Sequence, residues 1–190
     1  MKQLDLKERM ELYKKHLSKD FHKDEVKPFE MIEGLIAQNI YWCYGFFENE
    51  EQMGYAYLIK APNGEALLLD YLVVFEQYRN RGLGSAFLEL MKEKLKEKGA
   101  FLLAEVENPE FAETDKDSQT RQRRIMFYQK SGFGMTKVRS RIYQDNYHII
   151  SLALKENATN ELAFMELKRI YQAVFGEEFL KKNTKVELEA

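Results

Sequence analysis

Apolar residues recur along the chain in two patterns, short continuous runs typical of buried strands and spaced repeats typical of helices. The spaced repeats predict helices over residues 5–18, from Phe29 to about Gln38 and over Ser85–Leu95, and a last helix that Thr159 caps and Gly176 ends. The continuous runs predict strands over Tyr41–Phe47, Met53–Ile59, Leu67–Phe75, Ala100–Val106, Met135–Tyr143 and Tyr147–Leu154.

The order of these elements predicts the strand pairing. A strand over Leu67–Phe75, a helix and a strand over Ala100–Val106 imply a parallel pair with a right-handed crossover. The last two strands are joined by the turn Gln144–Asn146, which predicts an antiparallel pair. We therefore expect an α/β fold with a mixed sheet, formed by one domain over residues 1–155. Residues 156–190 form a helical extension that packs on this domain or on a partner subunit.

Composition excludes several classes of protein. Lys and Arg alternate with Asp and Glu, and the net charge is −2, so no basic stripe for nucleic acid is present. No apolar run approaches the roughly 20 residues of a membrane helix, and the charged N-terminus lacks a signal-peptide core. The single cysteine excludes an internal disulfide, and the three scattered histidines give no metal spacing. We expect a soluble cytoplasmic protein without a metal.

A basic, glycine-containing turn lies between the apolar run Leu67–Phe75 and the helix that follows. It reads Gln77-Tyr78-Arg79-Asn80-Arg81-Gly82-Leu83-Gly84. Glycines allow a ligand to approach the backbone closely, and the start of a helix offers unpaired N–H groups at its positive end, so the turn suits phosphate. It is neither a P-loop, whose string is absent, nor a dinucleotide fingerprint, because Phe87 replaces the third glycine.

Two segments carry a family resemblance. Arg79-x-x-Gly82-x-Gly84 resembles the R/Q-x-x-G-x-G/A signature of the GNAT superfamily of N-acetyltransferases, and Phe127–Phe133 resembles its F/L-Y-x-K-x-G-F segment. With the order of elements, the resemblance covers residues 4–155, although the family's first strand has no good candidate here. Asn80 departs from the glycine that many members have, but asparagine tolerates left-handed backbone angles.

The resemblance implies a central mixed sheet whose parallel pair splays around an acetyl-CoA site, with helices on both faces. It assigns main-chain contacts with the pantetheine arm to Leu72 and Val74. Asn108 either bonds the pantetheine or shapes a turn. Phosphate contacts fall on the turn and the helix start, at Arg79, Arg81, Gly82, Leu83, Gly84 and Ser85.

The resemblance also places Tyr128 as the acid that protonates the leaving thiolate. A phenol with a pKa near about 10 suits this role. The structural alternative is a core tyrosine beside Phe127 on an aromatic helix face.

Acetyl transfer to an amine also needs a base. Ala104-Glu105-Val106 resembles a string of ribosomal-protein N-terminal acetyltransferases in which the Glu activates the amine, so Glu105 is the candidate. A carboxylate inside an apolar strand is unusual, and burial raises the pKa of such a group. Glu107 on the same strand face and Asp70 on the neighbouring strand are rivals. For all three, the alternative is an exposed edge or a salt bridge.

Residues 109–124 read as a long exposed loop between the strand of Glu105 and the helix of Tyr128. Its acids come first and its arginines last, so it suits either a cationic amine or an acceptor carboxylate or phosphate. The alternative is a solvated insertion.

We therefore predict an enzyme that transfers acetyl from acetyl-CoA to a primary amine, on a small molecule or a peptide, by direct attack. The alternative is a non-catalytic acyl-CoA-binding or regulatory module on the same fold. The apolar C-terminal helix also suits a homodimer or an interaction role.

Overall fold

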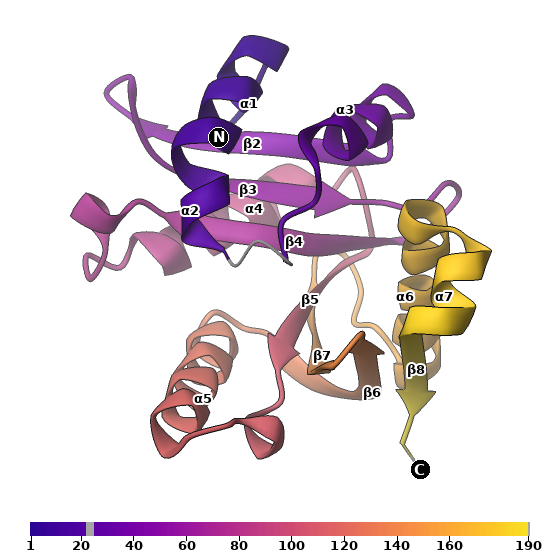
Figure 1. Ribbon diagram of the computed structural model, residues 1–190. Coiled ribbons are helices and arrows are strands. Elements are labelled where there is room, and N and C mark those ends of the chain that lie inside the picture. Colours follow the sequence, from indigo (N-terminus) through magenta and orange to yellow (C-terminus); the bar gives the residue numbers. More distant parts are fainter. Residues whose placement is uncertain (22–24, 190) are drawn as a thin grey trace. The chain divides into compact units, whose positions relative to one another are not determined.

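The computed structural model describes residues 1–21 and 25–189, which form helices and a set of strands (Figure 1). Contacts divide the chain into two compact units, Met1–Ile59 with Asp70–Phe87, and Lys60–Leu69 with Leu88–Ala190. Strand β4 (Ala66–Val74) and helix α4 (Leu83–Leu95) pass from one unit to the other. The fold is mixed α/β, as the sequence predicts.

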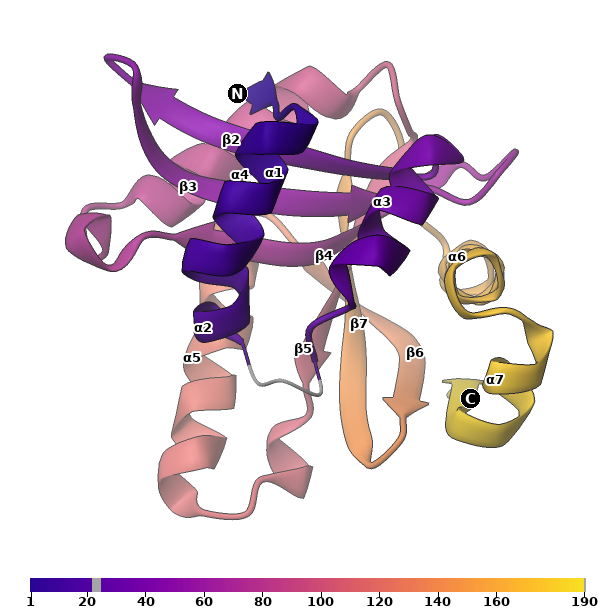
Figure 2. The same cartoon turned by 45° about the horizontal axis from the view of Figure 1, so that its top comes forward.

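The first unit contains strands in the order β1-β2-β3-β4. Strands β2 (Tyr41–Glu48) and β3 (Glu51–Ile59) pair antiparallel, and the Asp70–Val74 part of β4 follows. Successive side chains of a strand point to opposite faces of the sheet, so both faces carry apolar side chains, and helices cover both. Helices α1 (Leu6–Leu12) and α3 (Phe29–Ala37) lie on one face (Figure 2), whereas Phe46 on the other face stacks on Phe87 of α4 at 4.0 Å between ring centroids.

The N-terminus contains a strand that the sequence did not reveal. β1 (Lys2–Gln3) pairs antiparallel with β2, through Lys2↔Gly45 and Gln3↔Tyr44. Two residues are too few to show an alternating pattern, which explains why the strand was missed. The predicted first helix is confirmed, and it starts with a capping box in which Asp5 and Glu8 bond each other's backbone N–H. It continues through a π-helical turn (Tyr13–Leu17) and α2 (Ser18–Asp20).

The second unit contains strands in the order β4-β5-β7-β6-β8. β5 (Phe101–Glu107) pairs parallel with β4 from Ala66↔Phe101 to Leu69↔Ala104, which confirms the predicted parallel pair. β6 (Gly134–Ile142) and β7 (Asp145–Ala153) pair antiparallel, also as predicted. β7 adds antiparallel to β5, with Glu105 opposite Ile149.

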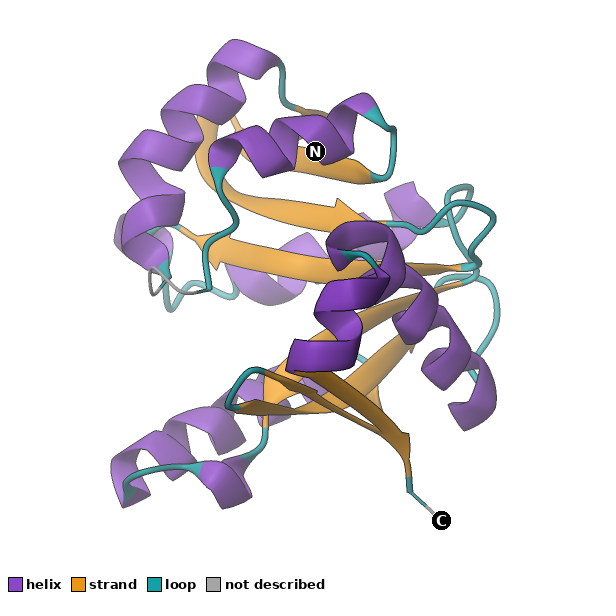
Figure 3. Ribbon diagram, turned by 45° about the vertical axis from the view of Figure 1, so that its right-hand side comes forward, coloured by secondary structure: helices purple, strands orange, loops and turns teal. Residues whose placement is uncertain are grey.

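The C-terminal segment contains two helices and a strand. α6 (Asn160–Phe175) starts where the Thr159 hydroxyl accepts the Leu162 N–H at 3.1 Å, and it ends at Gly176, whose φ is 78°. α7 (Glu177–Asn183) leads to β8 (Thr184–Leu188), the strand before the C-terminus in Figure 3. β8 pairs antiparallel with β6, so the extension that we expected to be helical also contains a strand. Its five mostly exposed residues give too short a pattern to identify.

The expected loop over residues 109–124 is also wrong. Most of it belongs to α5 (Asp115–Lys130), which follows a short 3₁₀ turn, η3 (Pro109–Phe111). Thr114 caps α5 by accepting the Asp117 N–H at 3.1 Å, and acids occupy the first turn where the helix dipole favours them. No residue of α5 is buried. Its first ten residues are all polar, so no apolar periodicity marked the helix.

Candidate active site

The turn before α4 contains two residues with left-handed backbone angles. Asn80 has a φ of 63° and Gly82 a φ of 76°, directly before the helix starts at Leu83. Asparagine therefore adopts the conformation that we expected it to tolerate. The first intrahelical bond runs from the Ala86 N–H to the Gly82 carbonyl at 3.2 Å, so the preceding amides lie at the positive helix end. This geometry can hold an anionic group.

Both arginines of the turn are held by contacts within the first unit. The Nε of Arg79 donates to the Val74 carbonyl at 3.0 Å, and its Nη2 lies 3.9 Å from Asp20 Oδ1. The guanidinium of Arg81 lies over the Tyr78 ring, 5.8 Å from its centroid. The turn thus combines helix-end amides with two exposed cations. Leu72 and Val74, half-buried on one face of β4, belong to the same unit.

Asp70, a candidate base, is held by two neighbours of the first unit. Lys27 Nζ lies 2.7 Å from Asp70 Oδ1 and 2.9 Å from Oδ2, and the Tyr41 hydroxyl donates to Oδ2. Burial, followed by the charge of Asp70, raises the pKa of Tyr41 well above its usual value, so Tyr41 remains the donor. The salt-bridge alternative therefore describes Asp70.

Glu105, the preferred base, lies on β5 in the second unit and is half-buried. Its Oε1 accepts a hydrogen bond from the hydroxyl of Tyr171 on α6, and Ser140 Oγ on β6 lies 3.5 Å from the same oxygen. In the sequence, Tyr171 belongs to the apolar C-terminal helix and Ser140 to a predicted strand, and neither stands out as a site residue. A carboxylate within an apolar strand needs a polar partner, but no local pattern shows which distant residue supplies it.

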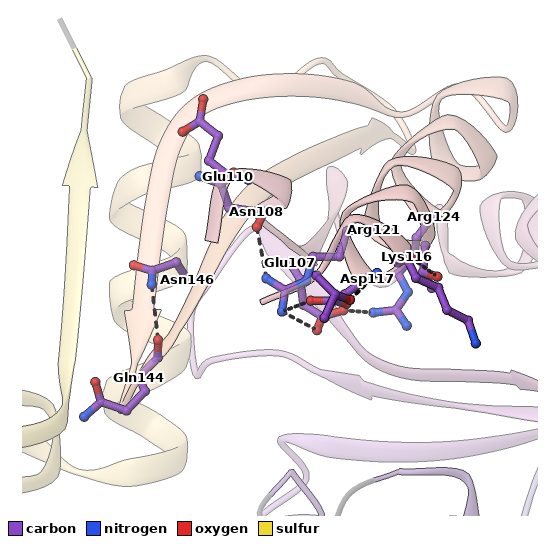
Figure 4. Close-up of polar contacts among 11 residues, drawn as sticks. Glu107, Asn108, Glu110, Lys116, Asp117, Arg121, Arg124, Gln144 and Asn146 are labelled. Atoms are coloured by element: carbon purple, nitrogen blue, oxygen red, sulfur yellow. Dashed lines mark hydrogen bonds and ion pairs between the residues drawn. The ribbon is translucent and has the colours of Figure 1, made fainter. Parts of the chain in front are cut away.

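Glu107, the second rival, is paired with two arginines of α5 (Figure 4). Arg124 Nη1 bonds Glu107 Oε2, and Arg121 Nη2 lies 3.8 Å from Oε1. Arg121 also pairs with Asp117 at 2.9 Å and donates to the Asn108 carbonyl at 3.0 Å. These contacts join α5 to the end of β5, so Glu107 serves as a structural ion-pair partner.

Asn108 shapes the turn after β5. Its side-chain oxygen accepts the Glu110 N–H at 2.9 Å, and its own N–H donates to the Asn146 carbonyl at 2.8 Å. The residue is 6% exposed. Of the two roles weighed for it, the structure shows the turn; a contact with pantetheine stays a prediction.

Tyr128, the candidate acid, lies on α5 between two phenylalanine rings. The centroids of Phe127 and Phe133 each lie 5.1 Å from that of Tyr128. The side chain is half-buried, and its partial removal from water raises the pKa of Tyr128 to about 12. Within the described residues its hydroxyl has no hydrogen-bond partner, so the phenol is a neutral donor at physiological pH.

Two further features bear on the chemistry of the protein, its single cysteine and its candidate metal ligands. Cys43 is 1% exposed on β2, and burial raises the pKa of its thiol to about 12, so the thiol is a core group. Within residues 1–21 and 25–189, no group of three or more His, Cys, Asp or Glu side chains is arranged to hold a metal ion. No helix in this described part has the length and apolar character needed to cross a membrane.

Residues 38–134 match the family model of the acetyltransferase (GNAT) domain. The chain belongs to the GNAT family of N-acetyltransferases. The matched range includes the turn and the candidates Asp70, Glu105 and Tyr128, but it ends before Ser140 and Tyr171. A search of curated proteins gave no match for this GNAT chain.

Solved structures share the GNAT fold. A protein of Bacteroides thetaiotaomicron assigned to the GNAT family is 18% identical with a TM-score of 0.69, covering 93% of this chain and 99% of its own. The spermidine N-acetyltransferase of Vibrio cholerae, in complex with CoA and spermine, is 8% identical with a TM-score of 0.60 and covers 80% and 94%. The ribosomal-protein-S18-alanine N-acetyltransferase of Escherichia coli is 22% identical with a TM-score of 0.55 and covers 84% and 96%.

Proposed function

We propose that this GNAT enzyme transfers the acetyl group of acetyl-CoA to a primary amine by direct attack. The observation that carries this proposal is the turn over residues 79–85, where left-handed Asn80 and Gly82 lead into the first amides of α4. Arg79, Arg81, Gly82, Leu83, Gly84 and Ser85 then bind the pyrophosphate of CoA. Solved GNAT-fold structures in complex with CoA support this choice of acyl carrier.

The carbonyl carbon of the thioester is the site of attack. The amine nitrogen forms a bond to this carbon, the carbon–sulfur bond breaks and the electron pair leaves with sulfur. A lysine-like amine is protonated below a pH of about 10.4, so it loses one proton before attack and a second as the amide forms. Glu105 takes the first proton, directly or through water, and the second replaces, through solvent, the proton that Tyr128 gives to the leaving thiolate. The Tyr128 hydroxyl has no hydrogen-bond partner among the described residues, and its raised pKa keeps it protonated although it also makes it a weaker acid.

The choice of Glu105 over its rivals rests on their contacts. Asp70 is paired with Lys27, and Glu107 with Arg121 and Arg124, so each carboxylate has a cation that stabilises its charge. Glu105 receives neutral hydroxyl donors from Tyr171 and Ser140. The cations beside Asp70 and Glu107 stabilise the ionised carboxylates and so lower the proton affinity that a base requires.

The acceptor is a primary amine of a small molecule or a peptide. Solved structures with this fold include a spermidine, an aminoglycoside and a ribosomal-protein N-acetyltransferase. These acceptors share the amine and little else. For this chain we therefore propose a primary amine as the acceptor group and name no particular acceptor molecule.

The test is isothermal calorimetry with acetyl-CoA, followed by measurement of CoA release with a panel of polyamines, aminoglycosides and N-terminal peptides. We expect binding, and turnover with at least one class of amine. Binding without turnover on the whole panel would favour the non-catalytic module, and absence of binding would refute both functions.

A further inference from the structure

Three side chains from separate elements of the second unit meet around one carboxylate oxygen. Glu105 comes from β5, Ser140 from β6 and Tyr171 from α6. The Tyr171 hydroxyl donates to Glu105 Oε1 and lies 3.0 Å from Ser140 Oγ, which in turn lies 3.5 Å from Oε1. The three groups therefore form one polar cluster, in which the two hydroxyl protons make two hydrogen bonds at a time.

Both hydroxyls of this cluster are inside the protein. Tyr171 is 1% exposed and Ser140 is 4% exposed, whereas Glu105 is only half-buried. The partners thus approach the carboxylate from its buried side. Burial, followed by the charge of Glu105, raises the pKa of Tyr171 well above its usual value, so the phenol stays protonated and always donates.

This inference rests on the proposed role of Glu105. We propose that Tyr171, with Ser140 as its partner, is a positioning residue that holds the Glu105 carboxylate in one orientation and keeps it ionised for amine deprotonation. A hydrogen bond to the charged form of a carboxylate lowers its pKa and opposes the effect of burial. The bond also restricts the rotation of the terminal carboxylate, which is otherwise broad.

The proposal gives the C-terminal segment a part in catalysis. Ser140 and Tyr171 lie beyond residues 38–134, the range that matches the GNAT domain model. α6 is fixed in the same unit by Glu166, which accepts the Glu65 and Ala66 N–H groups at 2.7 and 2.9 Å. Tyr171 lies five residues further along this anchored helix, so its hydroxyl is held in place.

Other charged and titratable groups also surround the cluster. Glu107 lies on the same face of β5 with its partners Arg121 and Arg124, and Tyr147 on β7 is opposite both Glu107 and Ser140. The Glu107 charge is compensated by the arginines. The neutral hydroxyl of Tyr171 is therefore the group whose removal changes the environment of Glu105 while the surrounding charges remain.

The test is Tyr171→Phe, which deletes the hydroxyl and keeps the ring. We expect the pKa of Glu105 to rise by about one unit, since a hydrogen bond to a charged group contributes about that much. The readout is a ¹³C NMR titration of the glutamate side-chain carboxyls, with the Glu105 signal assigned by its loss in Glu105→Gln. The acid limb of kcat/KM should move to higher pH by the same amount, with KM for acetyl-CoA unchanged.

Controls separate positioning from packing. Ser140→Ala should raise the pKa of Glu105 by a smaller amount, and it provides the measurement if Tyr171→Phe does not fold. Tyr143→Phe removes a hydroxyl from an exposed tyrosine of the same unit and should leave the titration unchanged. An unchanged Glu105 titration in a folded Tyr171→Phe or Ser140→Ala variant would overturn the inference.

The NMR titration needs no substrate, so it tests whether Tyr171 holds Glu105 in its ionised form even if no amine is acetylated. Failure of the proposed function appears as absence of acetyl-CoA binding or turnover in the wild type. A shifted pKa together with full activity of Glu105→Gln would show a buried carboxylate cluster that is not catalytic, and would overturn the inference as well.

Discussion

Lys27 and Asp70 form an ion pair in which Nζ lies 2.7 Å from Oδ1, and both side chains are about nine-tenths buried. The Tyr41 hydroxyl donates to the same carboxylate. The pair joins the segment before α3 to strand β4. Its first consequence concerns stability, because removing one partner leaves the other charge buried.

We expect Asp70→Asn to lower the free energy of unfolding by about 3–5 kcal/mol, since the buried Lys27 then loses the charge of Asp70. Urea denaturation monitored by circular dichroism measures this change. Glu11→Gln is the matched control, because the Glu11–Lys15 pair is exposed and should matter by less than about 0.5 kcal/mol. Loss of the acid limb of kcat/KM in Asp70→Asn would instead make Asp70 the base.

Glu105→Gln should abolish the acid limb of kcat/KM and lower its maximum by about 10²-fold or more, because the amide cannot accept a proton. Acetyl-CoA affinity should not change. The control is Glu107→Gln on the same strand face, which removes the partner of Arg121 and Arg124 and should keep the limb. If the two variants behave in the opposite way, Glu107 is the base.

Tyr128→Phe should reduce kcat by about 10²–10⁴ and leave the Kd of acetyl-CoA unchanged, since an acid acts in the transition state. Because burial raises the pKa of Tyr128 to about 12, its deprotonation cannot cause an alkaline loss of activity below about pH 10. Phe127→Leu, which changes the packing beside Tyr128, is the control and should preserve most of kcat. Wild-type kcat in Tyr128→Phe would leave only a packing role.

Gly82→Val should weaken acetyl-CoA binding at least tenfold while the fold is retained. The φ of 76° disfavours any L side chain, although a Cβ would meet no atom within 4 Å. The turn must therefore change its backbone to relieve the strain. Gly34→Val tests a glycine with equally open surroundings and no positive φ, and its calorimetric Kd should match that of the wild type. Equal affinity in both variants would refute the phosphate assignment.

Glu166→Ala should lower the free energy of unfolding by about 2–4 kcal/mol, because two N–H groups lose their acceptor. Glu166 is 1% exposed and bonds the Glu65 and Ala66 N–H groups as well as Arg169, so the alanine leaves buried groups unpaired. Glu161→Ala, at an exposed position of the same helix, should cost less than about 1 kcal/mol. Denaturant titration of both variants would contradict this anchoring role if their midpoints agreed.

The sequence predicted the elements that bury apolar residues. β4 and β5 carry continuous apolar runs, and α6 has a wide apolar face, so their position and pairing followed from hydrophobic pattern and connection length. α5 buries nothing, and β1 and β8 are held mainly by backbone pairing at an edge. Because such elements bury few side chains, their sequences show no hydrophobic pattern that would predict them.

The candidate site likewise has one part that the sequence predicts and another that it does not. The turn over residues 79–85 was predictable, because glycine spacing and left-handed angles are local properties. The partners of the carboxylates were not: Tyr171 is 66 residues from Glu105, and Lys27 is 43 residues from Asp70. Only the tertiary fold selects which hydroxyl or cation reaches each acid.

The burial of Cys43 bears on how acetyl transfer is followed in the laboratory. Each turnover releases one CoA thiol, which colorimetric disulfide reagents detect because they react with thiolates. Cys43 is the protein's single cysteine. Because its pKa is raised to about 12 and it is 1% exposed, its thiol does not react with these reagents while the protein is folded. A thiol signal above that of the enzyme alone therefore measures the CoA that is released. A slow rise of the signal without substrate indicates that the enzyme is unfolding.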